Sequence, residues 1–447
     1  MKIKLSFFLI FIFLLLSGCS FDNKTGIWKE HNQKIIEKEQ VIQENKKRIY
    51  TKRDTFDQEI ESKDIITVSK IRKNESWIEN NLSQSNDVGH LEYENNKNSI
   101  FKSKKIGKNR HKIESINPAP LIIDNNIFFS DLSGNIFCYS IDTEKIVWKF
   151  NFYKKKIKNI PIKINLKILS NNLIVSDNLG YFYNINLTTG RLFWAKNQGV
   201  PLTSEIKTYG EKIFLLNQDN KFYVFQKNNG EKILDFETFP VVLKKNNRQS
   251  LALGSNNDLY FATSAGQIFS INHESFKINW LKNIKNVSSS DEYGLFNSSP
   301  LIVKKESVFI SSSQNTISLS TSSGSILWEI PFGTIVRPVL SGRFIFLISK
   351  NGFILNSDIN SGKIIWSKKL FNSKELDINK IGEVNSLLLL SDQLFFTTKN
   401  GYFFFVNYEN GDIINYAKVS KGFYSKPAVA NGKIYIIDKN MRVLVFN

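Results

Sequence analysis

One pattern of apolar and polar positions recurs along residues 98–447. Each copy opens at a glycine or polar turn, continues as an alternation of apolar and polar positions, passes a second turn and usually ends in tryptophan. The seven copies are Gly134–Trp148, Gly180–Trp194, Asn220–Leu234, Gly266–Trp280, Gln314–Trp328, Gly352–Trp366 and Gly401–Asn415. Their final positions follow one another at intervals of 38 to 49 residues. A period of this length predicts a tandem array of equivalent structural units.

The alternation within each copy predicts β-strands. Apolar residues such as Phe137 and Tyr139 recur at every second position, which is typical of a half-buried strand. The second turn usually carries glycine, as at Gly190 and Gly324, because glycine adopts a positive φ without steric cost. Two further strand-like runs precede each copy. Four short antiparallel strands per unit form one blade of a β-propeller.

The two ends of the array predict how the ring closes. Residues 426–447 form an eighth copy that stops before its outermost strand. Residues 98–102 offer the missing strand, with Phe101 in the position of the tryptophan. Closure by strands from both chain ends removes exposed sheet edges. The sequence therefore predicts an all-β fold, an eight-bladed β-propeller of four-stranded antiparallel blades over residues 98–447.

The aromatic residues that close the copies allow two interpretations. They could form a belt of rings that stacks against a ligand, or they could pack one blade against the next. One large side chain per unit at a fixed register favours packing. We expect this structural role for Phe101, Trp148, Trp194, Trp280, Trp328 and Trp366.

The N-terminus resembles a lipoprotein signal. A short basic start precedes an apolar run, Leu5–Leu16, which has the length of a signal-peptide core and is short for a membrane span. The Leu-Ser-Gly-Cys sequence that ends at Cys19 resembles a bacterial lipobox, in which the cysteine is diacylated. The alternative is an ordinary signal peptide with an incidental cysteine. The lipobox predicts a signal peptide at 1–18, lipidation of Cys19 and, because Ser20 follows, sorting to the outer membrane.

Residues 19–97 are polar and charged, and they predict a lipidated tether that is mostly disordered. The alternative is a marginal helix, because Ile35, Ile42, Ile49 and Phe56 are seven positions apart. A flexible coil of this length reaches about 50 Å root-mean-square. The propeller would therefore face the periplasm at a distance from its lipid anchor.

Charge and composition narrow the function. The net charge is +19, and residues 98–447 carry +18 of it. This surplus fits attraction to an anionic membrane or an acidic partner, but AT-biased coding that spreads lysine over solvent faces explains it equally well. There is no dense basic run of the kind that binds nucleic acid. Two cysteines and four scattered histidines make no metal or triad motif, so we expect no cofactor, no metal and no catalytic residue.

The repeat and the signal together resemble a known family. The repeat is similar to the quinoprotein-type propeller repeat. Both have, in this order, a glycine, an apolar alternation, Asn or Asp, a second glycine and a closing tryptophan. With a lipobox and eight blades, the chain resembles the BamB family of outer-membrane β-barrel assembly lipoproteins, and residues 420–433 are similar to that family's last blade. The resemblance implies a non-catalytic scaffold. It would bind the periplasmic domains of the β-barrel insertase, with its associated lipoproteins, as a monomer within a larger complex.

The resemblance also implies a partner-binding surface on the loops between blades three and four and between blades four and five. The family's own motifs in these loops do not match, so the residues are assigned by position. They are Lys244, Lys245 and Arg248 in the first loop, and Asp291, Glu292, Phe296 and Asn297 in the second.

Two other functions remain open at this stage. A general adaptor lipoprotein could bind another envelope complex through the same propeller. Quinone-dependent dehydrogenases share the blade, but they need calcium ligands and a base carboxylate in a central funnel. The chain has no paired cysteines and no acid-rich motif for such a funnel. We therefore predict a scaffold and not an enzyme.

Overall fold

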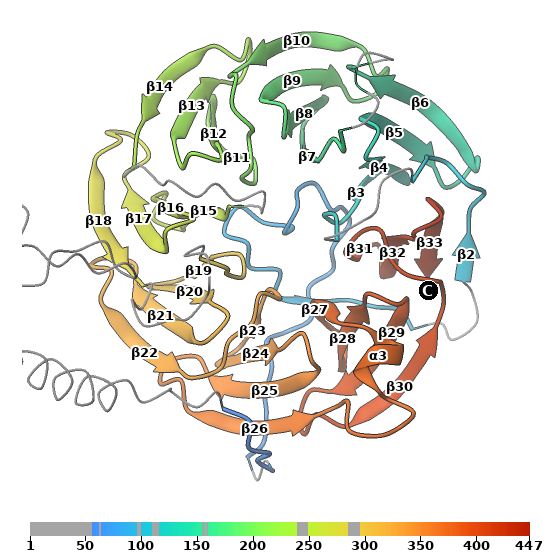
Figure 1. Ribbon diagram of the computed structural model, residues 1–447, viewed down its shortest axis with the longest axis vertical. Coiled ribbons are helices and arrows are strands. Elements are labelled where there is room, and N and C mark those ends of the chain that lie inside the picture. The colour runs from blue at the N-terminus through green and yellow to red at the C-terminus, as the bar shows by residue number, and fades with distance from the viewer. Residues whose placement is uncertain are drawn as a thin grey trace, which may run out of the picture. The chain divides into compact units, whose positions relative to one another are not determined.

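Eight blades of four antiparallel strands are arranged in a ring around a central axis in the computed structural model (Figure 1), and in one blade a short fifth strand, β1 (His90–Leu91), pairs parallel with the innermost strand. The structure describes residues 56–61, 64–95, 100–109, 116–153, 157, 160–238, 249–284 and 296–447, which belong to one compact unit. The predicted eight-bladed propeller is confirmed. The predicted signal peptide lies outside the described residues. Among the residues described, no helix combines the length and the apolar character that crossing a membrane requires.

Each blade has four strands, ordered here from the axis outwards. Blades one to four comprise β3 (Leu121–Ile123), β4 (Asn126–Ser130), β5 (Asn135–Ser140) and β6 (Lys145–Asn151); β7 (Ile164–Leu169), β8 (Asn172–Asp177), β9 (Tyr181–Asn186) and β10 (Leu192–Asn197); β11 (Lys207–Tyr209), β12 (Lys212–Leu216), β13 (Phe222–Gln226) and β14 (Lys232–Phe236); and β15 (Leu251–Leu253), β16 (Leu259–Ala262), β17 (Gln267–Ile271) and β18 (Ile278–Asn283).

Blades five to eight comprise β19 (Ile302–Lys304), β20 (Ser307–Ser311), β21 (Thr316–Ser320) and β22 (Ile326–Ile330); β23 (Val339–Ser341), β24 (Phe344–Ile348), β25 (Phe353–Asp358) and β26 (Ile364–Lys369); β27 (Val384–Leu390), β28 (Gln393–Thr398), β29 (Tyr402–Asn407) and β30 (Ile413–Lys418); and β31 (Ala428–Ala430), β32 (Lys433–Ile437), β33 (Val443–Phe446) and β2 (Ile100–Lys102). A single helical turn, α3 (Ile378–Ile381), lies between blades six and seven and is capped by Asp377.

The ring closes in blade eight as the sequence predicts. Strand β2 pairs antiparallel with β33, and Phe101 stands opposite Val445. The outermost strand of this blade therefore comes from the residues that precede blade one, and the other three come from the C-terminus. Opening the ring at this point requires the hydrogen bonds between the two strands to break.

The closing tryptophans lie against the following blade. The indole Nε1 of Trp280 donates to the carbonyl oxygen of Thr321 at 2.7 Å, and its ring covers Gly324, where an added Cβ would lie 2.5 Å from the indole. Trp148, Trp328 and Trp366 make the equivalent hydrogen bond at 2.8–3.1 Å and cover the equivalent glycines. Glycine is therefore required at the second turn of the repeat for two reasons: the backbone there has a positive φ, and a Cβ would collide with the indole of the preceding blade.

Two of the predicted packing residues differ from this arrangement. Trp194 packs edge-on against Phe182 and covers Gly230, but its Nε1 has no hydrogen-bond partner among the described residues. Phe101 is half-buried and packs against the cluster of buried apolar residues that blade eight shares with blades one and two.

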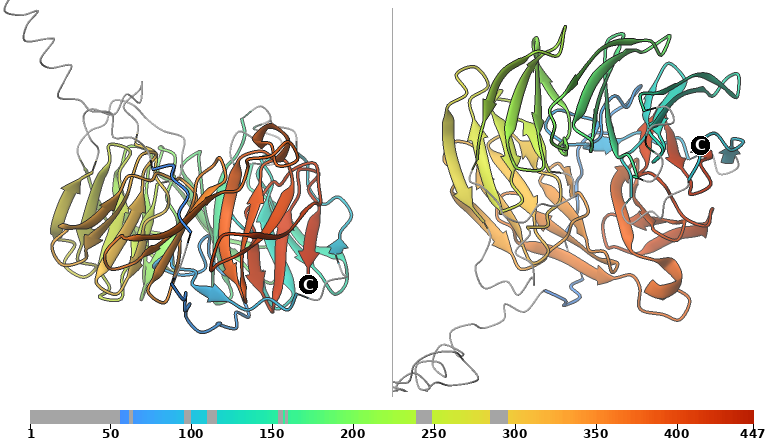
Figure 2. Two further views of the ribbon diagram at one scale, coloured as in Figure 1. Left: turned by 90° about the horizontal axis from the view of Figure 1, so that it is seen from below. Right: turned by 45° about the horizontal axis from the view of Figure 1, so that its top comes forward.

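Residues 64–95, which we call the hub segment, cross the centre of the ring (Figures 1 and 2). They hydrogen-bond to the innermost strand, or the turn at its end, in every blade. The contacts, in chain order, are Ser69 with Ser341 of blade six, Asn74 with Val429 of blade eight, Trp77 with Ile122 of blade one, Ile78 with Ile168 of blade two, Gln84 with Thr208 of blade three and Leu253 of blade four, Ser85 with Val303 of blade five, and β1 (His90–Leu91) with β27 of blade seven.

The predicted boundary at residue 98 is therefore wrong, because the described residues before it are part of the folded unit. Phe56 packs edge-on against Phe353, and Trp77 is buried in the core that blades one and two contribute to. The apolar residues of the hub segment are few and irregularly spaced, so they form neither a strand nor a helix pattern. Those that are buried, such as Trp77 and Leu91, are buried because the ring surrounds them.

A buried ion cluster holds the hub segment to blades two and three. Oε2 of Glu79 lies 3.0 Å from Nζ of Lys167 on β7 and 2.9 Å from Nζ of Lys207 on β11, and all three side chains are almost fully buried. Burial alone would raise the pKa of Glu79, but the two ammonium groups lower it below its ordinary value. Burial also lowers the pKa of Lys167, to about 8, against the opposing effect of Glu79.

Replacing Glu79 by glutamine should destabilise the protein strongly. Two buried ammonium groups would then lack their carboxylate, which costs about 3–5 kcal/mol of unfolding free energy. Glu94→Gln, on the exposed end of the same segment, is the control and should cost less than about 0.5 kcal/mol. Urea unfolding at neutral pH measures both.

Because the pKa of Glu79 is lowered in the folded state, the contribution of Glu79 to the unfolding free energy is present above its unfolded pKa and lost as the pH falls through its folded pKa. The wild type should therefore approach Glu79→Gln in acid; equal stability at neutral pH would contradict the cluster's role.

A pair of glycine substitutions separates ring packing from backbone strain. Gly324 and Gly210 both have positive φ, but an added Cβ meets Trp280 at Gly324 and nothing within 4 Å at Gly210. Gly210→Ala should therefore cost about 1–2 kcal/mol, whereas Gly324→Ala should cost about 1–3 kcal/mol more. Trp280→Ala should cost about 3–5 kcal/mol. Thermal unfolding of the three variants tests this, and an equal loss for the two glycines would show that the indole contact contributes nothing.

Candidate binding site in the central funnel

A cavity of about 310 Å³ lies on the axis of the ring, and we call it the funnel. Every blade contributes to its wall, and Asn80 and Asn81 of the hub segment line it as well. The hub segment contacts the innermost strands of the blades. Most of the funnel wall comes from two other parts of each blade: the residues that lead into or begin the innermost strand, and the turn between the second and third strands. The hub segment therefore occupies the axis at one end and leaves the funnel at the other.

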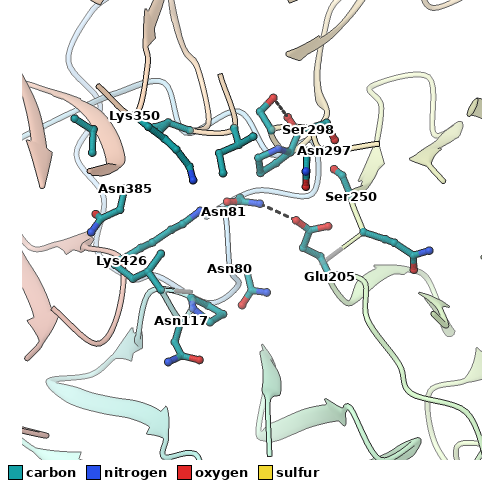
Figure 3. Close-up of a pocket in the computed structure, with 18 of the residues that line it drawn as sticks. Asn80, Asn81, Asn117, Glu205, Ser250, Asn297, Ser298, Lys350, Asn385 and Lys426 are labelled. Carbon is teal, nitrogen blue, oxygen red and sulfur yellow. Dashed lines mark hydrogen bonds between the residues drawn. The ribbon is translucent and has the colours of Figure 1, made fainter. Parts of the chain in front are cut away.

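Lysines dominate the charge of the funnel wall. They are Lys163, Lys350, Lys399, Lys426 and Lys439. In Figure 3, Lys350 points into the cavity from blade six and Lys426 points into it from blade eight. Burial and the positive charge of Lys399 together lower the pKa of Lys439.

Among the described residues that line the funnel, two carry carboxylates, Glu205 and Glu383, and both have partners. Glu383 lies 3.4 Å from the ammonium group of Lys350. Glu205 is buried, and its carboxylate accepts hydrogen bonds from Asn81 at 3.2 Å and from the backbone N–H of Leu251 at 2.9 Å. The funnel therefore presents cations and amides to a ligand, and it offers little free negative charge.

The described residues of the funnel lack the cluster of carboxylates that would hold a calcium ion beside a quinone. Calcium requires several oxygen ligands that converge on one point. In the part of the chain that the structure describes, no group of three or more His, Cys, Asp or Glu side chains could hold a metal ion. Glu205 is committed to Asn81 and Leu251, and Glu383 is committed to Lys350.

Two of the residues expected to bind a partner lie in the funnel wall. Phe296 and Asn297 line the cavity, and the backbone N–H of Phe296 donates to the carbonyl oxygen of Ser264 at 2.9 Å. The remaining expected residues lie outside the described part of the chain; they are Lys244, Lys245, Arg248, Asp291, Glu292 and the lipidation site Cys19. The six closing aromatic residues are absent from the described wall of the funnel.

The funnel lysines were not predicted from the sequence, although a signal for three of them exists. Lys350 and Lys399 each stand two positions before the opening glycine of a repeat copy, Lys439 stands at the corresponding place within the eighth copy, and each is followed by asparagine. They occupy equivalent turns between the second and third strands of blades six, seven and eight. Comparing the copies position by position, including the residues between them, would have found this series.

Comparisons with known proteins give a consistent result. A family model described as "Outer membrane protein assembly factor BamB" matches residues 147–368. The outer membrane protein assembly factor BamB of Shewanella oneidensis is 19% identical over 339 residues, which cover 73% of this chain and 83% of the relative.

Solved structures share the fold. The crystal structure of BamB from Moraxella catarrhalis superposes with a TM-score of 0.61 at 13% identity, over 78% of this chain and 99% of that chain. A europium-containing methanol dehydrogenase superposes with a TM-score of 0.64 at 11% identity, over 81% of this chain and 89% of that chain. At these identities a structural match shows the propeller alone. The family model and the named relative, however, confirm the predicted resemblance of this chain to the BamB family.

Proposed function

We propose that this protein is a non-catalytic scaffold of outer-membrane β-barrel protein assembly, which binds the periplasmic domains of the insertase. The similarity to proteins named outer membrane protein assembly factor, over about three quarters of the chain, is the observation that carries the proposal. The funnel supports it, since the carboxylates among its described residues are already paired and no group of three or more His, Cys, Asp or Glu side chains in the described part of the chain could hold a metal ion.

The proposed partner-binding surface is formed by the loops that lead into blades four and five. Lys244, Lys245 and Arg248 belong to the first loop, and Asp291, Glu292, Phe296 and Asn297 belong to the second. Positive and negative side chains in neighbouring loops would fix the orientation of a partner as well as attract it. Phe296 offers a partly buried aromatic ring in the second loop.

The proposed location follows from the signal. Lipid on Cys19 would hold the protein at the outer membrane, facing the periplasm, after removal of residues 1–18. Multiple acyl chains anchor a protein far more firmly than one chain does. A monomer is sufficient for this role, because the ring closes with strands of its own chain.

Cys19→Ser should release the protein from the membrane. Fractionation of cells that produce the tagged variant should find it in the soluble envelope fraction or uncleaved in the inner membrane, whereas the wild type remains in the outer membrane. Cys138→Ser, which changes a buried cysteine, is the control and should leave the location unchanged. Outer-membrane location of Cys19→Ser would exclude the lipid anchor.

Affinity purification of the full-length protein from detergent-solubilised envelopes tests the scaffold role. Mass spectrometry should find the β-barrel insertase and its lipoproteins in the eluate. The triple substitution of Lys244, Lys245 and Arg248 by glutamate should reduce the recovered insertase about tenfold, because charge reversal weakens association. Substituting the exposed Lys145 and Lys363 by glutamate should change it less than about twofold. An eluate that contains a different envelope complex would instead identify a general adaptor.

A further inference from the structure

Three lysines of the funnel form a series that the repeat itself creates. Lys350, Lys399 and Lys439 occupy the same position in the turns of blades six, seven and eight. The same position in the other five blades carries no charged residue; there the chain has Leu132, Asn178, Gln218, Ser264 and Ser312. Equivalent positions in neighbouring blades lie side by side around the axis. The three lysines therefore lie in neighbouring turns of one cavity wall, and we call them the lysine sector.

The lysine sector is only partly neutralised. Lys350 has Glu383 at 3.4 Å. Within the described ranges, Lys399 and Lys439 form no ion pair, and the charge of Lys399 together with burial lowers the pKa of Lys439. Holding these cations beside one another in a partly enclosed cavity costs free energy, which an anion placed between them would recover.

Amide side chains surround the lysine sector. Asn80 and Asn81 lie on the hub segment. In the funnel wall, Asn117 precedes blade one and Asn385 lies on β27 of blade seven. Lys426 of blade eight also reaches into the cavity (Figure 3). Amides both donate and accept hydrogen bonds, as backbone peptide groups do. A cavity of about 310 Å³ is at the lower end of the range for specific ligand sites and accommodates a short chain segment.

We propose that the funnel binds an acidic peptide segment of a partner protein, with its carboxylates held by Lys399 and Lys439 and its backbone held by the asparagines. Positive charge spread over three blades matches several carboxylates along one extended chain better than it matches one compact anion. The lysines of this site lie on blades six to eight and not on the loops before blades four and five, although Phe296 and Asn297 of the second loop also line the funnel. The failure of this site and the failure of the scaffold role can therefore be told apart.

Fluorescence anisotropy with a labelled octaglutamate peptide tests the site on the full-length protein in detergent. Binding should saturate and should weaken as salt is added. Lys399→Gln together with Lys439→Gln should weaken it about tenfold, because two charge contacts are lost, one from the exposed Lys399 and one from the half-buried Lys439. Lys145→Gln together with Lys363→Gln removes the same charge from the exposed outer strands and should change the affinity less than about twofold. Thermal unfolding of both double variants establishes that they remain folded.

Two further probes identify the ligand chemistry. A labelled octaglutamine peptide should bind at least about tenfold more weakly than octaglutamate if carboxylates are recognised. Inorganic phosphate should compete only weakly, because it cannot reach several lysines at once. The proposal is overturned if octaglutamate does not bind, if the two double variants lose affinity equally, if octaglutamine binds equally well, or if phosphate binds as tightly as the peptide.

Discussion

The contact between Glu79 and the buried lysines of blades two and three is the constraint on which the centre of this propeller depends. Lys167 and Lys207 lie on innermost strands, and their ammonium groups both reach Glu79 of the hub segment, where they are almost completely buried. Buried ammonium groups without a counter-charge would destabilise the ring. The hub segment supplies that counter-charge, and Lys207 also donates to the carbonyl oxygen of Ser83 and the side chain of Asn86. The blades and the segment that crosses them are therefore parts of one folded unit.

The hub segment also decides which part of the axis remains available. Its contacts follow the ends of the innermost strands, so one end of the axis is occupied by the chain itself. The funnel remains at the other end, and Asn80 and Asn81 belong to both. A site built in this way has a wall from all eight blades and positions fixed by their packing. Such a wall suits recognition of a peptide or a partner, because its charges are preorganised.

In the outer part of the ring, tryptophan contacts between neighbouring blades hold the blades together. Each of four tryptophans joins two blades by a hydrogen bond from its indole and by a ring face against a glycine, as Trp148 does with Leu187 and Gly190. These contacts repeat around the ring, and β2 closes the last gap against β33. A scaffold benefits from this arrangement, since loops on adjacent blades keep their spacing when one of them binds.

The sequence by itself determined everything that recurs. The alternation, the second glycine and the closing tryptophan predicted the blades, and the truncated eighth copy together with Phe101 predicted the closure, because each of these features is local or repeated. Only the tertiary structure decided the role of residues 64–95, since Glu79, Trp77 and Asn86 each meet a different partner and no period marks them. The funnel lysines lie between these cases. Their position in the repeat is visible in the sequence, but only the closed ring brings Lys350, Lys399 and Lys439 together around one cavity.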